Sequence, residues 1–161
     1  MERELLILRH AKSSWGEDDK ADVDRPLKHK GISDISFIAS KSMEISSGIQ
    51  KVVTSHAIRA VHTAILFSSR ISLPLSNICI DDRIYTADDY SLRNIIDEFP
   101  DDLTKALIVG HNPTLTYFVN LFLNNQIIEL PTSGLVYFKF KAKHWSAIAS
   151  ETLVNSDFIK P

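Results

Sequence analysis

Residues 5–14 read Leu5-Leu6-Ile7-Leu8-Arg9-His10-Ala11-Lys12-Ser13-Ser14, an apolar run that changes abruptly into cations, an imidazole and hydroxyls. Four consecutive apolar residues bounded by polar ones are typical of a strand that is buried on both faces, as in a parallel sheet. In open α/β sheets, ligands bind at the loops that follow the carboxyl ends of the strands. Guanidinium and hydroxyl donors suit a phosphate. The competing interpretation is a strand that simply ends where the chain reaches water.

Length and composition are those of an ordinary soluble domain. The chain has 161 residues, of which 44% are hydrophobic and 24% charged, and we expect one domain over residues 1–161. The 18 Lys and Arg against 20 Asp and Glu leave a formal net charge of −2, which argues against nucleic acid or an anionic membrane as partner. An anion site must therefore be a local cluster of cations.

The start of the chain and its cysteine usage also carry information. Residues 1–4 are mixed in charge and the following apolar run is too short for a signal peptide or a membrane span, so we expect a cytoplasmic protein. The single cysteine, Cys79, excludes an internal disulfide and a multi-cysteine zinc site. Its apolar neighbours predict a buried position in a strand.

Short apolar runs alternate with segments of helical periodicity along most of the chain. Besides the first strand, strands are predicted over residues 52–55, 78–80 and 106–109. Helices are predicted from about Ile32 to the turn at 46–48, and over about 57–70, 92–99 and 114–122. The first helix should bury Ile32, Ile35, Ile38, Ala39 and Met43. The alternation predicts a three-layer α/β/α sandwich with a mostly parallel central sheet.

The C-terminal segment has a different pattern. Residues 135–140 alternate, with Val136, Phe138 and Phe140 on one face and polar or amphipathic side chains on the other. Residues 147–154 are the predicted partner strand. An antiparallel hairpin at the edge of the sheet is therefore expected here.

Three of the predicted strands end in loops with related chemistry. The first supplies Arg9 and His10, the second is followed by Arg59, and a third is followed by His111. Because parallel strands place their carboxyl ends at one edge of the sheet, we expect these four side chains to converge. Two guanidiniums and two imidazoles suit phosphoryl transfer without a metal, with one imidazole as nucleophile and the other as a donor to the phosphoryl oxygens.

The motifs at these positions, in their order, resemble those of the histidine phosphatase superfamily, also called phosphoglycerate mutase-like. Leu8-Arg9-His10 resembles its Arg-His-Gly signature, with Ala11 in the place of glycine. Residues 25–31, 54–64 and 109–113 resemble three further segments of that family, with Lys28 in the place of a threonine. The resemblance runs from Leu5 to about Gly134. The full run Arg-His-Ala-Lys-Ser-Ser-Trp looks like the SixA-like branch of phosphohistidine phosphatases.

The resemblance implies roles for individual residues. His10 would be the nucleophile, Arg9 and Arg59 would clamp the phosphoryl group, and His111 would complete the pocket. Ser13 lies in the loop where the family often has a polar substrate contact. No cofactor is implied, and the remaining histidines have no metal-ligand spacing, so no metal is expected. His29, His62 and His144 are expected at the surface, whereas His56 is either exposed or at the pocket mouth.

One departure from the family pattern concerns the general acid. Most branches carry an acidic residue after the third strand, and here Arg83 falls in its place while Asp81, Asp82, Asp88 and Asp89 are out of register. An alkoxide leaving group needs proton donation, worth about 10²–10⁴ in rate, whereas the nitrogen of a phosphoramidate can be protonated beforehand. The pattern favours a P–N substrate, unless the loop is aligned incorrectly.

The sequence thus predicts a cofactor-independent phosphatase, a hydrolase that works through phospho-His10 on phosphohistidine in proteins. A small-molecule phosphomonoesterase on the same site is the first alternative, and a non-catalytic phosphate-binding or partner-binding module is the second. The role of Asp22, Asp24 and Arg25 stays open between a solvated loop and a support for Arg9. The acidic segment 16–24 is expected to be an exposed loop that could admit a protein surface.

Overall fold

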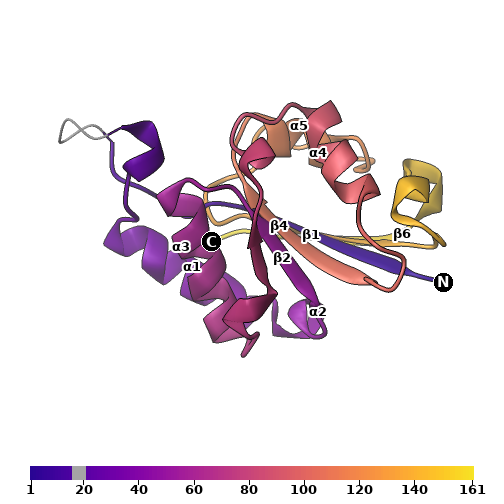
Figure 1. Cartoon of the computed structure of the whole chain (residues 1–161), viewed down its shortest axis with the longest axis horizontal. Coiled ribbons are helices and arrows are strands. Elements are labelled where there is room, and N and C mark those ends of the chain that lie inside the picture. Colours follow the sequence, from indigo (N-terminus) through magenta and orange to yellow (C-terminus); the bar gives the residue numbers. More distant parts are fainter. Residues whose placement is uncertain (16–20) are drawn as a thin grey trace.

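A six-stranded sheet lies between two layers of helices (Figure 1) in the computed structural model, which describes residues 1–15 and 21–161. The strands are β1 (Arg3–Arg9), β2 (Lys51–Thr54), β3 (Ile78–Ile80), β4 (Lys105–Gly110), β5 (Leu135–Phe140) and β6 (Leu153–Ile159). The helices are α1 (His29–Lys41), α2 (Met43–Ser46), α3 (Ile58–Arg70), α4 (Asp89–Asp97) and α5 (Thr114–Asn120). Short 3-10 turns include η1 (Asp22–Asp24) and η3 (Asp82–Ile84). The predicted three-layer sandwich is confirmed.

The strand order is β3-β2-β4-β1-β5-β6. The first four strands in this order pair in parallel, and β5 and β6 continue the sheet as antiparallel strands. The predicted mostly parallel sheet with an antiparallel C-terminal edge is therefore correct. Because β1 and β4 are central, both of their faces are buried, which explains their uninterrupted apolar sequences.

The core consists of one apolar cluster on each face of the sheet. Successive side chains of a strand point to opposite faces, so Leu5 and Ile7 pack in the cluster beneath α4 and α5. Leu6 and Leu8 pack in the cluster beneath α1 and α3. Because its side chains pack in both clusters, β1 is held in place from both faces of the sheet. The start of the loop after Arg9 is therefore well positioned.

The C-terminal hairpin differs from its predicted form. The partner of β5 is β6, residues 153–159, and not residues 147–154. Trp145 and Ile148 are buried in the core, so the chain before β6 is drawn into short 3-10 turns instead of a strand. The hairpin does form the edge of the sheet, with β6 outermost and β5 between β1 and β6, but Tyr137, expected on the polar or amphipathic face of β5, is buried.

Cys79, Ile32 and Met43 were expected to be buried, and these expectations were wrong because neighbours decide burial. Cys79 is exposed, since β3 is the short edge strand of the sheet. Ile32 and Met43 are exposed, whereas Ile35, Ile38 and Ala39 of the same predicted face are buried. Of the acidic segment 16–24, residues 16–20 lie outside the described part of the chain, and residues 22–24 form turn η1.

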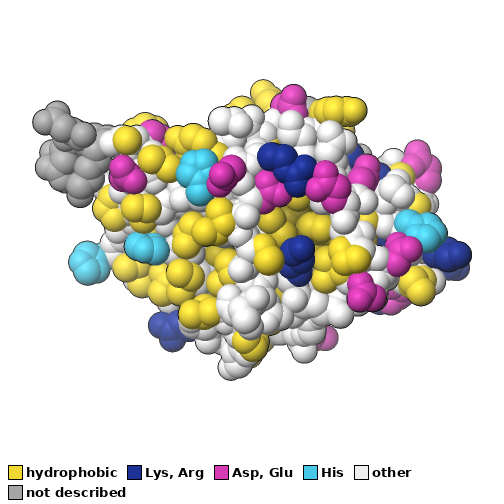
Figure 2. All heavy atoms as spheres, in the orientation of Figure 1, with side chains coloured by type: hydrophobic (Ala, Val, Ile, Leu, Met, Phe, Trp, Pro, Cys, Tyr) yellow, Lys and Arg dark blue, Asp and Glu magenta, His cyan; other side chains and the backbone are white. Residues whose placement is uncertain are grey.

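Charges of both signs occur together on the face of the molecule that Figure 2 draws. Figure 2 shows acidic and basic side chains intermingled on one face of the molecule, without a large area of a single sign. In the described residues no helix combines the length and the apolar character needed to cross a bilayer.

Candidate active site

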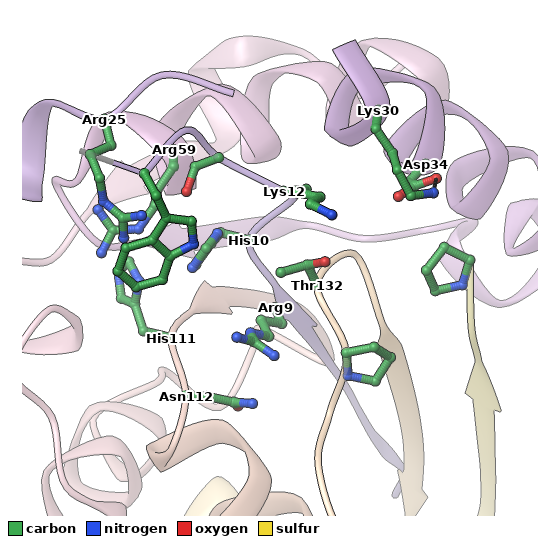
Figure 3. Close-up of a pocket in the computed structure, with 14 residues that line it drawn as sticks. Arg9, His10, Lys12, Arg25, Lys30, Asp34, Arg59, His111, Asn112 and Thr132 are labelled. Atoms are coloured by element: carbon green, nitrogen blue, oxygen red, sulfur yellow. Dashed lines mark hydrogen bonds and ion pairs between the residues drawn. The ribbon is translucent and has the colours of Figure 1, made fainter. Parts of the chain in front are cut away.

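A cavity of about 370 Å³ lies at the carboxyl edge of the parallel strands. It brings together the loops after β1 and β4 and the start of α3, and Figure 3 shows Arg9, His10, Arg59 and His111 gathered in it. The five sequence-predicted site residues all line the cavity, including Ser13. The described lining carries five cationic side chains and one carboxylate: Arg9, Lys12, Arg25, Lys30, Arg59 and Asp34. This is the local cation cluster that a chain of net charge −2 requires for an anion site.

His10 is held in a defined tautomer. Its Nδ1 lies 2.8 Å from the carbonyl oxygen of Ala11, and because a carbonyl only accepts, Nδ1 carries the proton. Burial, together with the nearby guanidiniums of Arg59 and Arg9, lowers the pKa of His10 to about 4, although the hydrogen bond to the Ala11 carbonyl acts in the opposite direction. The ring is therefore neutral at pH 7, and its Nε2 keeps an unprotonated lone pair.

His111 lies beside this nucleophile candidate. The centroids of the two imidazoles are 5.1 Å apart. Burial lowers the pKa of His111 to about 3, with contributions from His10 and Arg59. Its Nε2 lies 2.6 Å from Oγ of Ser55, while its Nδ1 is buried without a hydrogen-bond partner among the described residues. His111 is thus a neutral ring with one nitrogen held by the protein.

Arg9 is oriented by the loop that precedes β5. Its Nη1 donates to Oε1 of Glu129 at 2.7 Å and to the carbonyl oxygen of Leu130 at 2.8 Å. Asp22 and Arg25, which the sequence left as possible supports of Arg9, make contacts elsewhere. The support of Arg9 therefore comes from a segment about 120 residues away, which sequence inspection missed.

Asp22 organises the other side of the cavity. The buried Arg59 donates from Nη1 to the Asp22 carbonyl oxygen at 2.6 Å and from Nη2 to Oδ2 at 2.9 Å. The Tyr85 hydroxyl donates to Oδ2 at 2.6 Å, and Nε of Arg25 donates to Oδ1 at 2.9 Å. The hydrogen bond from Tyr85, with those of the cations, lowers the pKa of Asp22 to about 2. The open question about Asp22 is thereby resolved: it is a fixed anion that holds Arg59 and Arg25.

The loop after β1 is tied down by backbone contacts. The N–H of Ala11 donates to Oγ1 of Thr63 at 2.9 Å, and the N–H of Lys28 donates to the carbonyl oxygen of Lys12 at 2.9 Å. Ser13 is buried and bridges to Leu27. These contacts explain why the sequence motifs around residues 25–31 and 54–64 accompany the Arg-His pair: they hold its loop.

Unpartnered polar atoms occur on residues that line the cavity. Nε of Arg9, Nε of Arg59 and Nδ1 of His111 are buried and have no hydrogen-bond partner among the described residues. Buried polar groups are paired in more than about 90% of cases, so three exceptions around one cavity call for an explanation. A bound anion in this region is the partner that such a group of donors fits.

No carboxylate among the described side chains of the loop after β3 lines the cavity. Arg83, expected at the family's acid position, binds Asp81 and Glu98 and is not part of the cavity lining. Asp82 lies 3.1 Å from Nδ1 of the exposed His56, which does not line the cavity either. The residue of this loop that reaches the site is Tyr85, whose ring meets that of His111 edge-on at 5.5 Å.

Metal-binding geometry is not found in the described residues, where no group of three or more His, Cys, Asp or Glu side chains is placed to hold an ion. The one carboxylate of the described cavity lining, Asp34, is paired with Lys30 at 3.0 Å. The described side chains of the cavity lining supply mainly guanidiniums, ammonium groups, imidazoles and hydroxyls.

Sequence comparison assigns these features to a known family. The family model of the histidine phosphatase superfamily (branch 1) matches residues 5–83, which include Arg9, His10 and Arg59. An uncharacterized protein of Mycobacterium leprae is 35% identical over 158 residues, covering 90% of this chain and 94% of that protein. The chain belongs to the histidine phosphatase superfamily. It is accordingly a phosphatase, a hydrolase that releases phosphate, as the motifs indicated.

Solved structures show the same fold for this histidine phosphatase. The putative phosphohistidine phosphatase SixA from Agrobacterium tumefaciens matches with a TM-score of 0.81 at 22% identity, covering 99% of this chain and 98% of that one. A mycobacterial glucosyl-3-phosphoglycerate phosphatase matches with a TM-score of 0.67 at 12% identity, covering 99% and 98%. The fold is thus shared with phosphatases whose names give different substrates.

Proposed function

We propose that this histidine phosphatase is a cofactor-independent phosphohistidine phosphatase that works through a phosphohistidine intermediate on His10, with residues 1–161 acting as one domain. The observation that carries the proposal is the tautomer and the protonation of the His10 ring. Its Nδ1 proton is bound by the Ala11 carbonyl, so the lone pair of Nε2 is available at pH 7 in a cavity lined by three arginines, Arg9, Arg25 and Arg59.

In the proposed first step, Nε2 of His10 attacks phosphorus while the bond to the leaving group breaks. When the leaving group is a histidine of the substrate protein, the other nitrogen of its phosphorylated ring has taken up a proton, so that breaking the P–N bond releases a neutral imidazole. Arg9 and Arg59 offset the charge of the phosphoryl oxygens, His111 donates a hydrogen bond to them, and Ser13 contacts the substrate. Water then attacks phospho-His10, which releases inorganic phosphate and restores the neutral ring.

A P–N substrate is favoured because the described carboxylates near the cavity, which could protonate a leaving group, are bound to other groups. The Asp34 carboxylate is engaged by Lys30, and the described acidic residues of the loop after β3 are held by Arg83, His56 or the start of α4. Cleavage of an alkyl phosphate would need a proton from such a group. A phosphoramidate carries its proton to the reaction, so it fits a site built mainly from cations.

A small phosphorylated molecule is the second candidate substrate. The cavity volume of about 370 Å³ exceeds that of a phosphate group and falls within the range of small-ligand pockets, about 300–1,000 Å³. The likeness in fold to a glucosyl-3-phosphoglycerate phosphatase supports the same possibility. The third alternative, a non-catalytic phosphate-binding module, disagrees with the family of the chain, and such a binder has no need of the unprotonated His10.

The test compares phosphate release from a phosphohistidine-bearing protein with release from an aryl phosphate, each with and without a chelator. Wild type, His10→Ala and the control His29→Ala, which removes an exposed imidazole outside the cavity, are assayed together. We expect chelator-insensitive release that is faster on the phosphohistidine protein and falls by more than about 10³-fold in His10→Ala. Mass spectrometry of the quenched enzyme should locate the phosphoryl group on His10.

Each outcome decides between the candidates. Faster release from the aryl phosphate would keep the mechanism and replace the substrate. Release that is unchanged in His10→Ala would overturn the mechanism. Phosphate binding without release from either substrate would identify a binding module.

A further inference from the structure

Ser55 and His111 are the residues that directly follow two neighbouring strands. Ser55 follows β2 and His111 follows β4, and these strands pair in parallel with Thr54 opposite Val109. Strand β4 therefore runs one residue further than β2, and the side chains that follow the two strands meet at the carboxyl edge of the sheet. Oγ of the fully buried Ser55 lies 2.6 Å from Nε2 of His111. The register of the sheet holds this contact in place.

The contact has two chemically distinct forms. Either the Ser55 hydroxyl donates to an unprotonated Nε2, or a protonated Nε2 donates to the hydroxyl oxygen. The N–H of Ala57 already donates to Oγ of Ser55 at 3.4 Å, so one acceptor position of this oxygen is in use and its proton is free to point toward His111. The surroundings of Ser55 are therefore compatible with its acting as the donor.

The two forms differ at the other nitrogen of the ring. When Ser55 donates, Nδ1 of His111 carries a proton; in the opposite form, Nδ1 presents a lone pair. This Nδ1 is buried without a partner among the described residues, in a ring that lines the cavity beside Arg9 and Arg59. An N–H group attracts the anion that this cation cluster fits, whereas a lone pair repels it. The form in which Ser55 donates to Nε2, and Nδ1 carries the proton, is therefore the one that favours binding of an anion.

We propose that Ser55 is a positioning residue: its hydroxyl donates to Nε2 of His111 and so holds the ring in the Nδ1–H tautomer, which donates to the phosphoryl group. At pH 7 the ring of His111 is neutral and carries a single N–H proton. Which of its two nitrogens holds that proton therefore decides whether Nδ1 can donate. The inference rests on the proposed function, in which His111 is a donor to the phosphoryl oxygens. Ser55 itself does not touch the reacting atoms.

The direct test is nitrogen NMR of the histidine rings in the wild-type protein at pH 7, with His111→Gln used to assign the signals. The unprotonated and protonated nitrogens of a neutral imidazole have well-separated resonances, so the tautomer is read without turnover. We expect a protonated Nδ1 and an unprotonated Nε2 for His111. A protonated Nε2 would overturn the inference and leave the proposed function standing, since the latter is tested separately by His10→Ala.

Variants connect the tautomer to catalysis. Ser55→Ala should shift His111 toward the Nε2–H tautomer and lower kcat/KM by about 10²-fold, the usual loss for one preorganised donor. Ser55→Thr keeps the hydroxyl and should keep both the tautomer and most of the activity. The matched control is Ser68→Ala in α3, which removes an equally buried hydroxyl and should change neither.

The spectroscopic result separates positioning from simple packing. An Nδ1–H tautomer that persists in Ser55→Ala would contradict the inference even if activity fell. If Ser55→Ala did not fold, the wild-type spectrum would still decide the question, because it requires no substitution at Ser55.

Discussion

Gly31 at the start of α1 lies directly against the backbone of Lys12. A Cβ atom built on Gly31 would be 2.4 Å from the Lys12 carbonyl oxygen and 2.9 Å from its nitrogen. Real Cβ atoms do not approach backbone atoms so closely, so this helix can support the loop after His10 only with glycine here. The contact explains why a glycine accompanies the Arg-Pro-Leu segment in the motif.

The substitution Gly31→Ala should therefore displace the loop that carries Ser13. We expect a loss of about 1–3 kcal/mol in the free energy of unfolding, as for other overpacked sites, together with a fall in kcat/KM. The control Gly48→Ala has no neighbour within 4 Å but a φ of +78°, so it should cost about 1 kcal/mol through backbone strain alone. Denaturant unfolding and steady-state kinetics check both; equal activity of the two variants would contradict the assigned role of Gly31.

Thr63→Val should destabilise the protein although it preserves the shape of the side chain. Oγ1 of Thr63 accepts the N–H of Ala11 at 2.9 Å and donates to the carbonyl oxygen of Arg59 at 2.6 Å. Valine leaves the buried amide unpaired, which costs about 1–3 kcal/mol. Urea unfolding measures the loss, and Thr63→Ser, which keeps the hydroxyl, should restore most of it. A Thr63→Val variant as stable as Thr63→Ser would show that the hydrogen bond contributes little.

Asp22→Asn should weaken catalysis without removing any group that contacts the phosphoryl oxygens. Both carboxylate oxygens of Asp22 accept hydrogen bonds, from Arg59, Arg25 and Tyr85, whereas an amide offers one acceptor and places its NH₂ against a donor. Arg59 then loses its fixed position, and a displacement of about 1 Å costs up to about 10²-fold in rate. We expect kcat/KM to fall by about 10–10²-fold.

The control for that experiment is Asp24→Asn, which changes an exposed carboxylate on the same turn. It should leave kcat/KM within a factor of about two of wild type, the range expected for a surface change of up to about 0.5 kcal/mol. A comparable loss in both variants would point to the general charge of the turn and not to the contacts of Asp22.

The titration of His10 should lie well below that of an ordinary histidine. Burial and the neighbouring guanidiniums lower the pKa of His10 to about 4, so the neutral nucleophile persists as the pH falls from 7 to about 5. Its protonation, and the loss of nucleophilicity, should begin only near pH 4. NMR titration of the ring protons, with His10→Gln for assignment, measures this directly. An apparent pKa at or above 6.5 would contradict the described environment.

The same shift has a consequence for stability. In the unfolded chain a histidine has a pKa of about 6.5, so below that pH the unfolded state binds protons that folded His10 and His111 do not bind. Their contribution therefore makes the folded state less stable as the pH falls from about 6.5 toward 4. In His10→Gln the free energy of unfolding should decrease less between pH 7 and pH 5 than in wild type.

Much of the fold was readable from local patterns. The apolar run of residues 5–8, the β-branched run at 52–54 and the run at 106–109 are strands because only a doubly covered sheet buries such segments completely. The polar loops that follow them converge because parallel strands share a carboxyl edge, so the sequence alone groups Arg9, His10, Arg59 and His111. Periodicity also predicted the helix over about residues 114–122, which the structure places at Thr114–Asn120.

Tertiary structure decided what depends on neighbours distant in sequence. The exposure of Cys79 follows from the edge position of β3, and the place of the last strand follows from the burial of Trp145 and Ile148. The partners of the site are likewise remote: Glu129 for Arg9, Asp22 for Arg59 and Ser55 for His111. A short sequence pattern is enough to identify the groups that carry the chemistry, because each group lies in the loop directly after an apolar strand that can be recognised in the sequence. Which atoms orient those groups, and with what protonation, is set by contacts that form only when the strands and loops assemble.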